Sequence, residues 1–175
     1  MAEYLANATQ LVELNQPVVF TASIPCPNGN IVHEDETGIF ILRGCTSGCN
    51  SFARYQVTFN GNIAVPEGGT AGPIAISITT NGEPRATSRA IVTPAEAEEY
   101  SNVTSTAIIT VPRGCCYSLS VRAVSGLVDD ATGTTSIESS TSGVTLTLVK
   151  LVMRFPWALN GLTRTRRWTP VSLLR

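Results

Sequence analysis

Charged residues are scarce in this 175-residue chain. Asp, Glu, Lys and Arg together make up 14% of the sequence, whereas about a quarter is usual in a globular domain. Thr, Ser, Val, Ile, Ala and Gly dominate instead, a composition that favours β-strands and an uncharged polar surface. Such surfaces are common in proteins that bury much of their exterior in assemblies.

The residue patterns of common enzymes are missing. The chain has one histidine, His33, and no nucleophile motif accompanies it, so a Ser/His/Asp set is not expected. It also lacks a Gly-rich phosphate loop, a dinucleotide fingerprint and a metalloprotease helix. The acidic residues 34–36 beside His33 are interpreted as a solvated turn, because consecutive side chains on an extended chain point to opposite faces. The sequence therefore predicts a protein that is not an enzyme and holds no metal or cofactor.

Long hydrophobic runs are also missing. No window reaches the roughly 18 apolar residues that a membrane helix needs. The first residues, "MAEYLANATQLVELNQ", have neither a basic flank nor an apolar core, so we expect no secretory signal there. If the protein acts outside a cell, we expect it to leave by lysis or by assembly into a particle, unless the sequence lacks its leader. We interpret residues 1–16 as an N-terminal arm.

Short alternating segments separated by turn signals fill most of the rest. In "ARYQVTFNGNIAV", Tyr55, Val57 and Phe59 alternate with polar residues, which predicts a strand with one dry face. Similar segments recur at regular intervals, a spacing typical of an all-β antiparallel sandwich. The other candidate strands are "PVVFTAS" from Pro17, "NIVHE" from Asn30, "GIFILRG" from Gly38, "PIAISITTNGEPRATSRAIVT" from Pro73, "NVTSTAIITV" from Asn102, "CYSLSVRAVS" from Cys116 and "GVTLTLVKLV" from Gly143.

Local turn signals predict several connections. Asn81-Gly82 between two apolar segments predicts a two-residue type I′ hairpin. Asn60-Gly61 is compatible with a turn or with a bulge in a continuing strand. In "VTPAEAEEY", Thr93 as a cap and Pro94 at the first helical position predict a short helix. The polar loop 128–142 is interpreted as solvated or as a place where a receptor or glycan binds.

The five cysteines leave several alternatives open. "CTSGC" and "CC" give only a loose version of zinc-ligand spacing, so zinc is disfavoured. In an oxidising compartment Cys45 and Cys49 can close a small loop, while the adjacent Cys115 and Cys116 are expected to face opposite ways, one towards the core and one towards a neighbour. The odd number leaves one thiol free or available for a bond between subunits. In a reducing compartment all of them can be buried small residues. The candidates are Cys26, Cys45, Cys49, Cys115 and Cys116.

The last segment differs in charge from the rest. Residues 1–152 carry 7 basic and 13 acidic residues, a balance of −6, whereas residues 153–175 carry five arginines and no acid, a balance of +5. Arginine with interleaved aromatics suits docking on a partner protein. An accidental extension is the second interpretation, and nucleic-acid binding ranks last. The candidate anchoring residues are Arg154, Trp157, Arg164, Arg166, Arg167 and Trp168.

Four phrases in their order resemble a known family: "RYQVTFNGNI", "PIAISITTNGEP", "TAIITVPRGCCYSLSV" and "GVTLTLVKLV". They resemble the tumour-necrosis-factor-like jelly roll shared by the heads of collagen-tailed complement proteins, and most of all its bacterial branch, such as the head of the collagen-like glycoprotein on Bacillus spores. The resemblance covers about residues 17–152 and implies a sandwich of about ten strands that forms a homotrimer. It also implies that Tyr55, Val57, Phe59, Leu146 and Leu148 serve the core or the trimer interface.

Together these observations predict a non-enzymatic structural or adhesive module. We expect a homotrimer on the outer surface of a spore, cell or virion, with the tail 153–175 docking on neighbouring surface proteins. A phage fibre or head-decoration protein that binds a host receptor is the first alternative. A monomeric carbohydrate-binding module is the second. The ligand, whether glycan or receptor, is not defined by the sequence.

Overall fold

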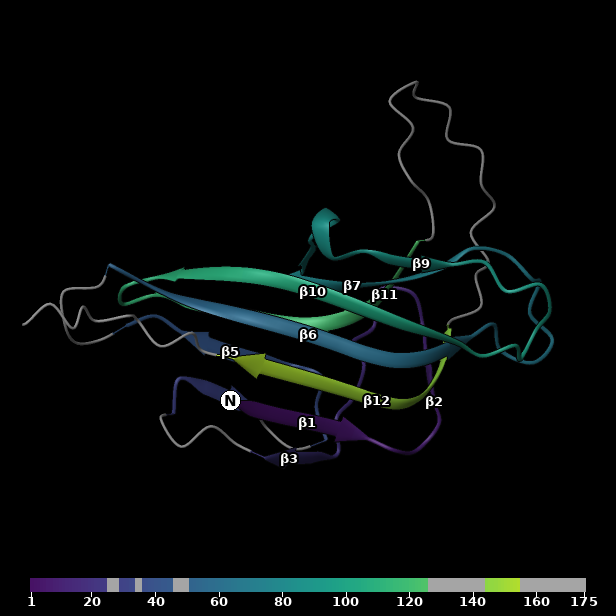
Figure 1. Cartoon of the computed structure of the whole chain (residues 1–175), viewed down its shortest axis with the longest axis horizontal. Helices are drawn as coiled ribbons and strands as arrows, with labels where there is room; N and C mark the ends of the chain where they lie inside the picture. Colours follow the sequence, from purple (N-terminus) through teal and green to yellow (C-terminus); the bar gives the residue numbers. More distant parts are fainter. Residues whose placement is uncertain (25–28, 34–35, 46–50, 126–143, 155–175) are drawn as a thin grey trace, which may run out of the picture.

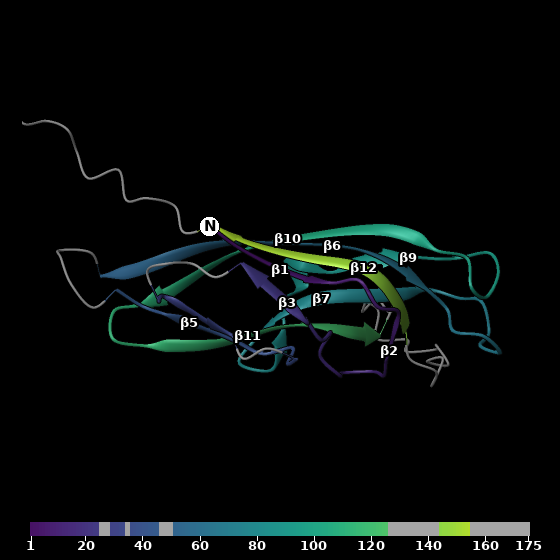
Figure 2. The ribbon, with the colours of Figure 1, turned by 90° about the horizontal axis from the view of Figure 1, so that it is seen from below.

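The computed structural model describes residues 1–24, 29–33, 36–45, 51–125 and 144–154, which form two packed antiparallel sheets of six strands each. In sheet A the order is β10-β6-β12-β1-β3, with β2 paired to β12; in sheet B it is β4-β5-β11-β7-β8, with β9 paired to β7. Figure 2 shows β10, β6 and β12 in one layer and β5 and β11 in the other. The predicted all-β antiparallel sandwich is confirmed.

Each sheet takes its strands from several parts of the chain. Sheet A consists of β1 (Ala2–Ala6), β2 (Gln10–Val12), β3 (Ala22–Ile24), β6 (Phe52–Ala64), β10 (Ser101–Pro112) and β12 (Val144–Arg154). Sheet B consists of β4 (Ile31–His33), β5 (Phe40–Arg43), β7 (Ile74–Thr80), β8 (Glu83–Pro84), β9 (Ala90–Val92) and β11 (Cys116–Ser125). A 3-10 turn, η1 (Ala86–Ser88), connects β8 to β9.

Alternation along β6 and β10 produces a buried and an exposed face. Tyr55, Val57 and Phe59 are fully buried, whereas Arg54 and Gln56 between them are exposed. On β10, Ile109 and Val111 are buried in the same way. Because successive side chains of a strand point to opposite faces, one face of sheet A is sealed against sheet B and the other is left outside.

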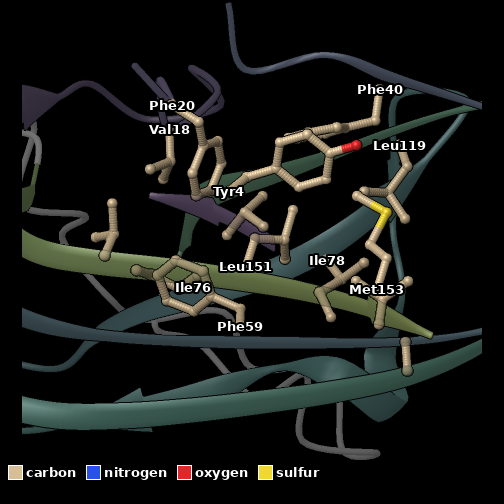
Figure 3. Close-up of a cluster of buried hydrophobic side chains, with 14 of the residues drawn as sticks. Tyr4, Val18, Phe20, Phe40, Phe59, Ile76, Ile78, Leu119, Leu151 and Met153 are labelled. Atoms are coloured by element: carbon tan, nitrogen blue, oxygen red, sulfur yellow. The ribbon is translucent and has the colours of Figure 1, made fainter. Parts of the chain in front are cut away.

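The core lies between the two sheets, and aromatic rings fill one part of it. Tyr4 of β1 meets Phe40 of β5 edge to face, with ring centroids 4.6 Å apart. Phe20 meets Phe40 in the same manner at 5.5 Å. Figure 3 shows these rings beside Leu119 of sheet B and Met153 of sheet A. Edge-to-face pairs add to the burial of apolar area, so this cluster ties β1 to sheet B.

Strand β7 is buried on both faces. Ile76 and Ile78 belong to the core, and Ser77 and Thr79, which alternate with them, are also fully buried. The segment after β8 covers this second face, because Ser88 Oγ lies 3.2 Å from Ser77 Oγ and accepts from the Ile78 amide at 3.1 Å. The hydroxyls of Thr79 and Ser120 lie 2.7 Å apart. These hydrogen bonds explain why polar residues are tolerated there.

The Asn81-Gly82 hairpin prediction is confirmed. Thr80 pairs with Glu83, which leaves two residues in the loop. Asn81 and Gly82 have φ angles of 53° and 87°, as a type I′ turn requires. Asn81 Oδ1 also accepts from the Ser118 amide at 3.0 Å, so the hairpin is attached to β11.

The predicted helix at Thr93 is wrong. Residues 93–100 form bends and turns between β9 and β10. Glu98 adopts a φ of 62°, which breaks a right-handed helix, and its amide donates to the carbonyl of Val65 at 2.9 Å. The Ala95 amide donates to the Glu99 carboxylate at 2.7 Å. Local capping signals were therefore overridden by attachment of this segment to the end of β6.

The predicted boundaries of the jelly roll need correction at both ends. Residues 1–16 are not an arm, because β1 lies between β12 and β3 in sheet A and pairs Ala2 with Met153. At the other end, β12 runs through Met153 to Arg154 rather than stopping at residue 152. The sandwich therefore begins at Ala2, and Figure 1 shows the start of β1 beside the end of β12.

Asn60-Gly61 lies inside β6, and the irregularity is in its neighbour. The register between β6 and β12 shifts between Thr147 and Lys150, so two residues of β12 face Gly61. Of these two residues, Leu148 has a φ of 51° and is exposed, whereas Val149 is buried. This is a β-bulge. The expected bulge therefore exists, but β12 carries it.

Candidate interaction surface

The outer face of sheet A is uncharged where residues 58–62 of β6 lie beside residues 102–108 of β10, whereas Arg54 and Arg154 lie nearer one end of the same face. It is formed by the residues of β6 and β10 that alternate with the core residues. We call this surface the amide–threonine face. Its members are Thr58, Asn60, Asn62, Asn102, Thr104, Thr106 and Ile108.

Side chains of the amide–threonine face bind one another across the two strands. Asn60 Nδ2 donates to Thr104 Oγ1 at 2.8 Å and to Asn102 Oδ1 at 3.1 Å. Asn102 Nδ2 in turn donates to Asn62 Oδ1 at 3.0 Å. The hydroxyls of Thr58 and Thr106 lie 3.2 Å apart. The polar groups are thus paired within the protein, which lowers the cost of removing water from this face.

The face also carries exposed apolar side chains. Ile108 is 61% exposed and lies opposite Gln56 in the register. Leu148, at the bulge of β12, is 59% exposed. An ion pair on the neighbouring strands β12 and β1 joins Lys150 Nζ to Glu3 Oε2 at 3.0 Å. A surface with neutral hydrogen-bonded amides and exposed isoleucine and leucine suits contact with another protein surface.

The five residues predicted for the core or an interface separate into two groups. Tyr55, Val57, Phe59 and Leu146 are fully buried in the sandwich. Leu148 lies outside the core, because its left-handed backbone at the bulge turns it away from the inner row of β12. The structure does not bring these residues together as one surface.

The cysteines are only partly described. Cys26 and Cys49 lie outside the described residues, as does the predicted Cys45–Cys49 loop. Cys45, Cys115 and Cys116 are free thiols, and the last two are exposed. The expectation that either Cys115 or Cys116 faces the core is wrong, because the turn before β11, with Gly114 at a φ of 75°, leaves both at the surface.

His33 belongs to the aromatic cluster of the core. Its ring stacks on Phe40 with centroids 4.3 Å apart and meets Tyr4 edge-on at 4.9 Å. Nε2 hydrogen bonds with the carbonyl oxygen of Thr37 at 3.0 Å. The geometry assigns this histidine a packing role.

Two predicted surfaces lie outside the described residues. They are the loop 128–142 and the tail beyond Arg154, with Trp157, Arg164, Arg166, Arg167 and Trp168; Arg154 itself is exposed at the end of β12. Within the described ranges, no group of three or more His, Cys, Asp or Glu side chains is placed to hold a metal ion. The described part of the chain likewise has no helix of the length and apolarity needed to cross a membrane.

The amide network was missed in the sequence. From the sequence, Asn60-Gly61 is interpreted only as a turn or a bulge, and Asn102 only as the start of a strand. Asparagine is depleted in strands, so two asparagines at alternate positions of a strand are the signal that was available. The pairing partner on β10 was not accessible to local patterns, because Asn60 and Asn102 are far apart in sequence.

No protein-family model matches the chain, and no curated protein matches it. Among solved structures it is similar to the globular domain of zebrafish complement 1qA protein, at 14% identity and a TM-score of 0.53, over 89% of this chain and 97% of that chain. It overlaps more loosely with the EclA C-terminal domain, described as a sugar-binding protein, at 19% identity and a TM-score of 0.36, over 85% and 82% of the two chains. The first likeness shows that the sandwich has the C1q-like fold.

Proposed function

We propose that this protein is a non-enzymatic structural or adhesive module that forms homotrimers through sheet A, at the surface of a spore, cell or phage particle. The observation that carries the proposal is the amide–threonine face, where the amides are paired within the protein and Ile108 is exposed at one end of the same face, opposite Gln56. Burying such a face costs little desolvation and removes apolar area from water. Heads of the C1q-like fold usually trimerise, which supports three as the subunit number.

The proposal is tested by measuring mass in solution. Light scattering at micromolar concentration is expected to give about three times the chain mass of 18.6 kDa. Ile108→Arg places a charge on the exposed apolar part of the face and is expected to produce monomers, because an unpaired buried charge is costly. Ile91→Arg is the matched control, since Ile91 is 41% exposed on β9 of sheet B.

Two outcomes contradict the proposal. A wild-type monomer favours the alternative of a monomeric binding module. A trimer that survives Ile108→Arg but not Ile91→Arg places the interface on sheet B. Thermal melting of each purified variant shows whether it is folded. Loss of assembly is then not mistaken for loss of structure.

A further inference from the structure

Exposed arginines gather at one end of the sandwich. The register places Arg54 of β6 opposite Thr110, and Arg154 of β12 opposite Gln56. Arg113 lies in the turn from β10 to β11, and Arg43 ends β5 opposite Cys116. Figure 1 shows the start of β6 and the ends of β10 and β12 at this left-hand end. We call Arg43, Arg54, Arg113 and Arg154, all exposed, the arginine end.

Five exposed glutamates gather at the opposite end. Glu83 on β8 is not among them, because it pairs with Thr80, which faces Leu119 near the start of β11. Thr145 pairs with Ala64 and Ser101 with Ile63, so the segments that follow β2 and β6 and precede β10 meet there. The described acid nearest to the arginine end in the register of sheet A, Glu3, is bound to Lys150. The described acids of the far end are Glu13, Glu67, Glu96, Glu98 and Glu99, all exposed.

The backbone beneath the arginine end is held in place. The Gly44 amide donates to the Cys115 carbonyl at 2.8 Å, and a Cβ at Gly44 would collide with the Pro112 carbonyl oxygen. The buried Tyr55 hydroxyl donates to the carbonyl of Arg43. Arg43 and Arg113 are therefore carried by two chain segments in direct contact, which fixes the spacing of their backbones.

Arginine suits one class of ligand in particular. Its guanidinium binds sulfate, phosphate and carboxylate groups through paired donors. Arg54 and Arg154 are diagonal neighbours across β6 and β12, with Cα atoms about 7–8 Å apart by sheet geometry. Like charges at this spacing repel one another, and an anion between them relieves that repulsion.

The described part of the arginine end does not offer a stacking platform for bases. Its exposed aromatic ring, Phe52, has the Arg54 guanidinium carbon 5.4 Å from its centroid, so a cation already occupies one face of that ring. Single-stranded nucleic acids use free aromatic faces for their bases. We propose that the arginine end binds an acidic polysaccharide, and that the acidic far end repels the same polymer so that it binds at one end only.

The test uses the full chain and fluorescent heparin as the probe, with affinity measured by anisotropy over a series of salt concentrations. Arg54→Gln with Arg154→Gln is expected to weaken binding about tenfold or more at low salt. It is also expected to flatten the slope of log affinity against log salt by about 1.5, because each neutralised anionic group contributes about 0.7–0.9. Glu67→Gln with Glu96→Gln is the matched control, since it changes two charges at the far end.

The control separates a local site from net charge. If net charge alone drove binding, the control variant would bind heparin more tightly by as much as the arginine variant loses; we expect its affinity to stay within about twofold, because the far end lies beyond the reach of screened charges. An unchanged affinity in the arginine variant overturns the proposal. The proposal is also overturned if heparin affinity falls only in a variant whose tail arginines 164, 166, 167 and 175 are replaced by Gln. Tighter binding of single-stranded DNA than of heparin overturns it as well.

Discussion

At the scale of single residues, close backbone contacts decide where glycine is needed. Gly61 lies opposite the bulge of β12, and a Cβ added there would be 2.9 Å from Val149 Cγ1 and 3.0 Å from Phe59 Cζ. Both of these side chains are buried, so neither can move without disturbing the core. A glycine that local sequence suggests is a turn residue is therefore a packing residue.

Gly61→Ala is expected to lower the free energy of unfolding by about 1–3 kcal/mol, the usual range for overpacking a core. Urea denaturation of wild type and variant measures this difference. Gly72→Ala is the control, because the nearest atom to its added Cβ is the Thr70 carbonyl oxygen at 4.0 Å. Equal effects of the two substitutions would show that backbone entropy, rather than contact with Val149, governs Gly61.

At the scale of elements, the bulge of β12 places two leucines of one strand in different environments. Leu146 is fully buried and Leu148 is 59% exposed, although they are two residues apart. In a regular strand they would share a face. Alternation alone therefore assigns Leu148 to the core row, and the inserted residue is what moves it out.

Leu148→Gly is expected to change the free energy of unfolding by less than about 1 kcal/mol, because the left-handed backbone at Leu148 disfavours residues with a side chain. Leu146→Gly is expected to cost about 3 kcal/mol or more, since a buried leucine is removed. Both are measured by urea denaturation at low protein concentration. If both variants lost similar amounts of unfolding free energy, Leu148 would have to be buried, which would contradict its exposed position at the bulge.

Sequence reasoning succeeded where the determinant is local. Alternation located β6, β10 and β12, and the Asn81-Gly82 pair defined a hairpin, because both signals act over a few residues. It failed at Thr93, where a contact of Glu98 with Val65 overrides the capping signal. The surface network of Asn60 with Asn102 depends on strand pairing between distant segments, which composition and local spacing do not encode.

At the scale of the whole molecule, assembly and stability are linked. If three chains share the amide–threonine face, only the folded form associates, so the melting temperature of the wild type is expected to rise with protein concentration. Ile108→Arg is expected to melt at a temperature that does not depend on concentration. Differential scanning calorimetry over a concentration series measures both, and a wild-type melting temperature without such dependence would contradict assembly through this face.

The pairing of Ala2 with Met153 has a practical consequence for engineering. Because the first and last strands of the sandwich are hydrogen-bonded neighbours, a short linker can join residue 154 to residue 1, and new chain ends can be opened at the Asn81-Gly82 hairpin without cutting a strand. Cargo fused at the natural strand ends would emerge beside the arginine end. Cargo carried by such a circular permutant would leave from the end of β7 in sheet B instead, so the choice of chain ends selects the sheet beside which the cargo is displayed.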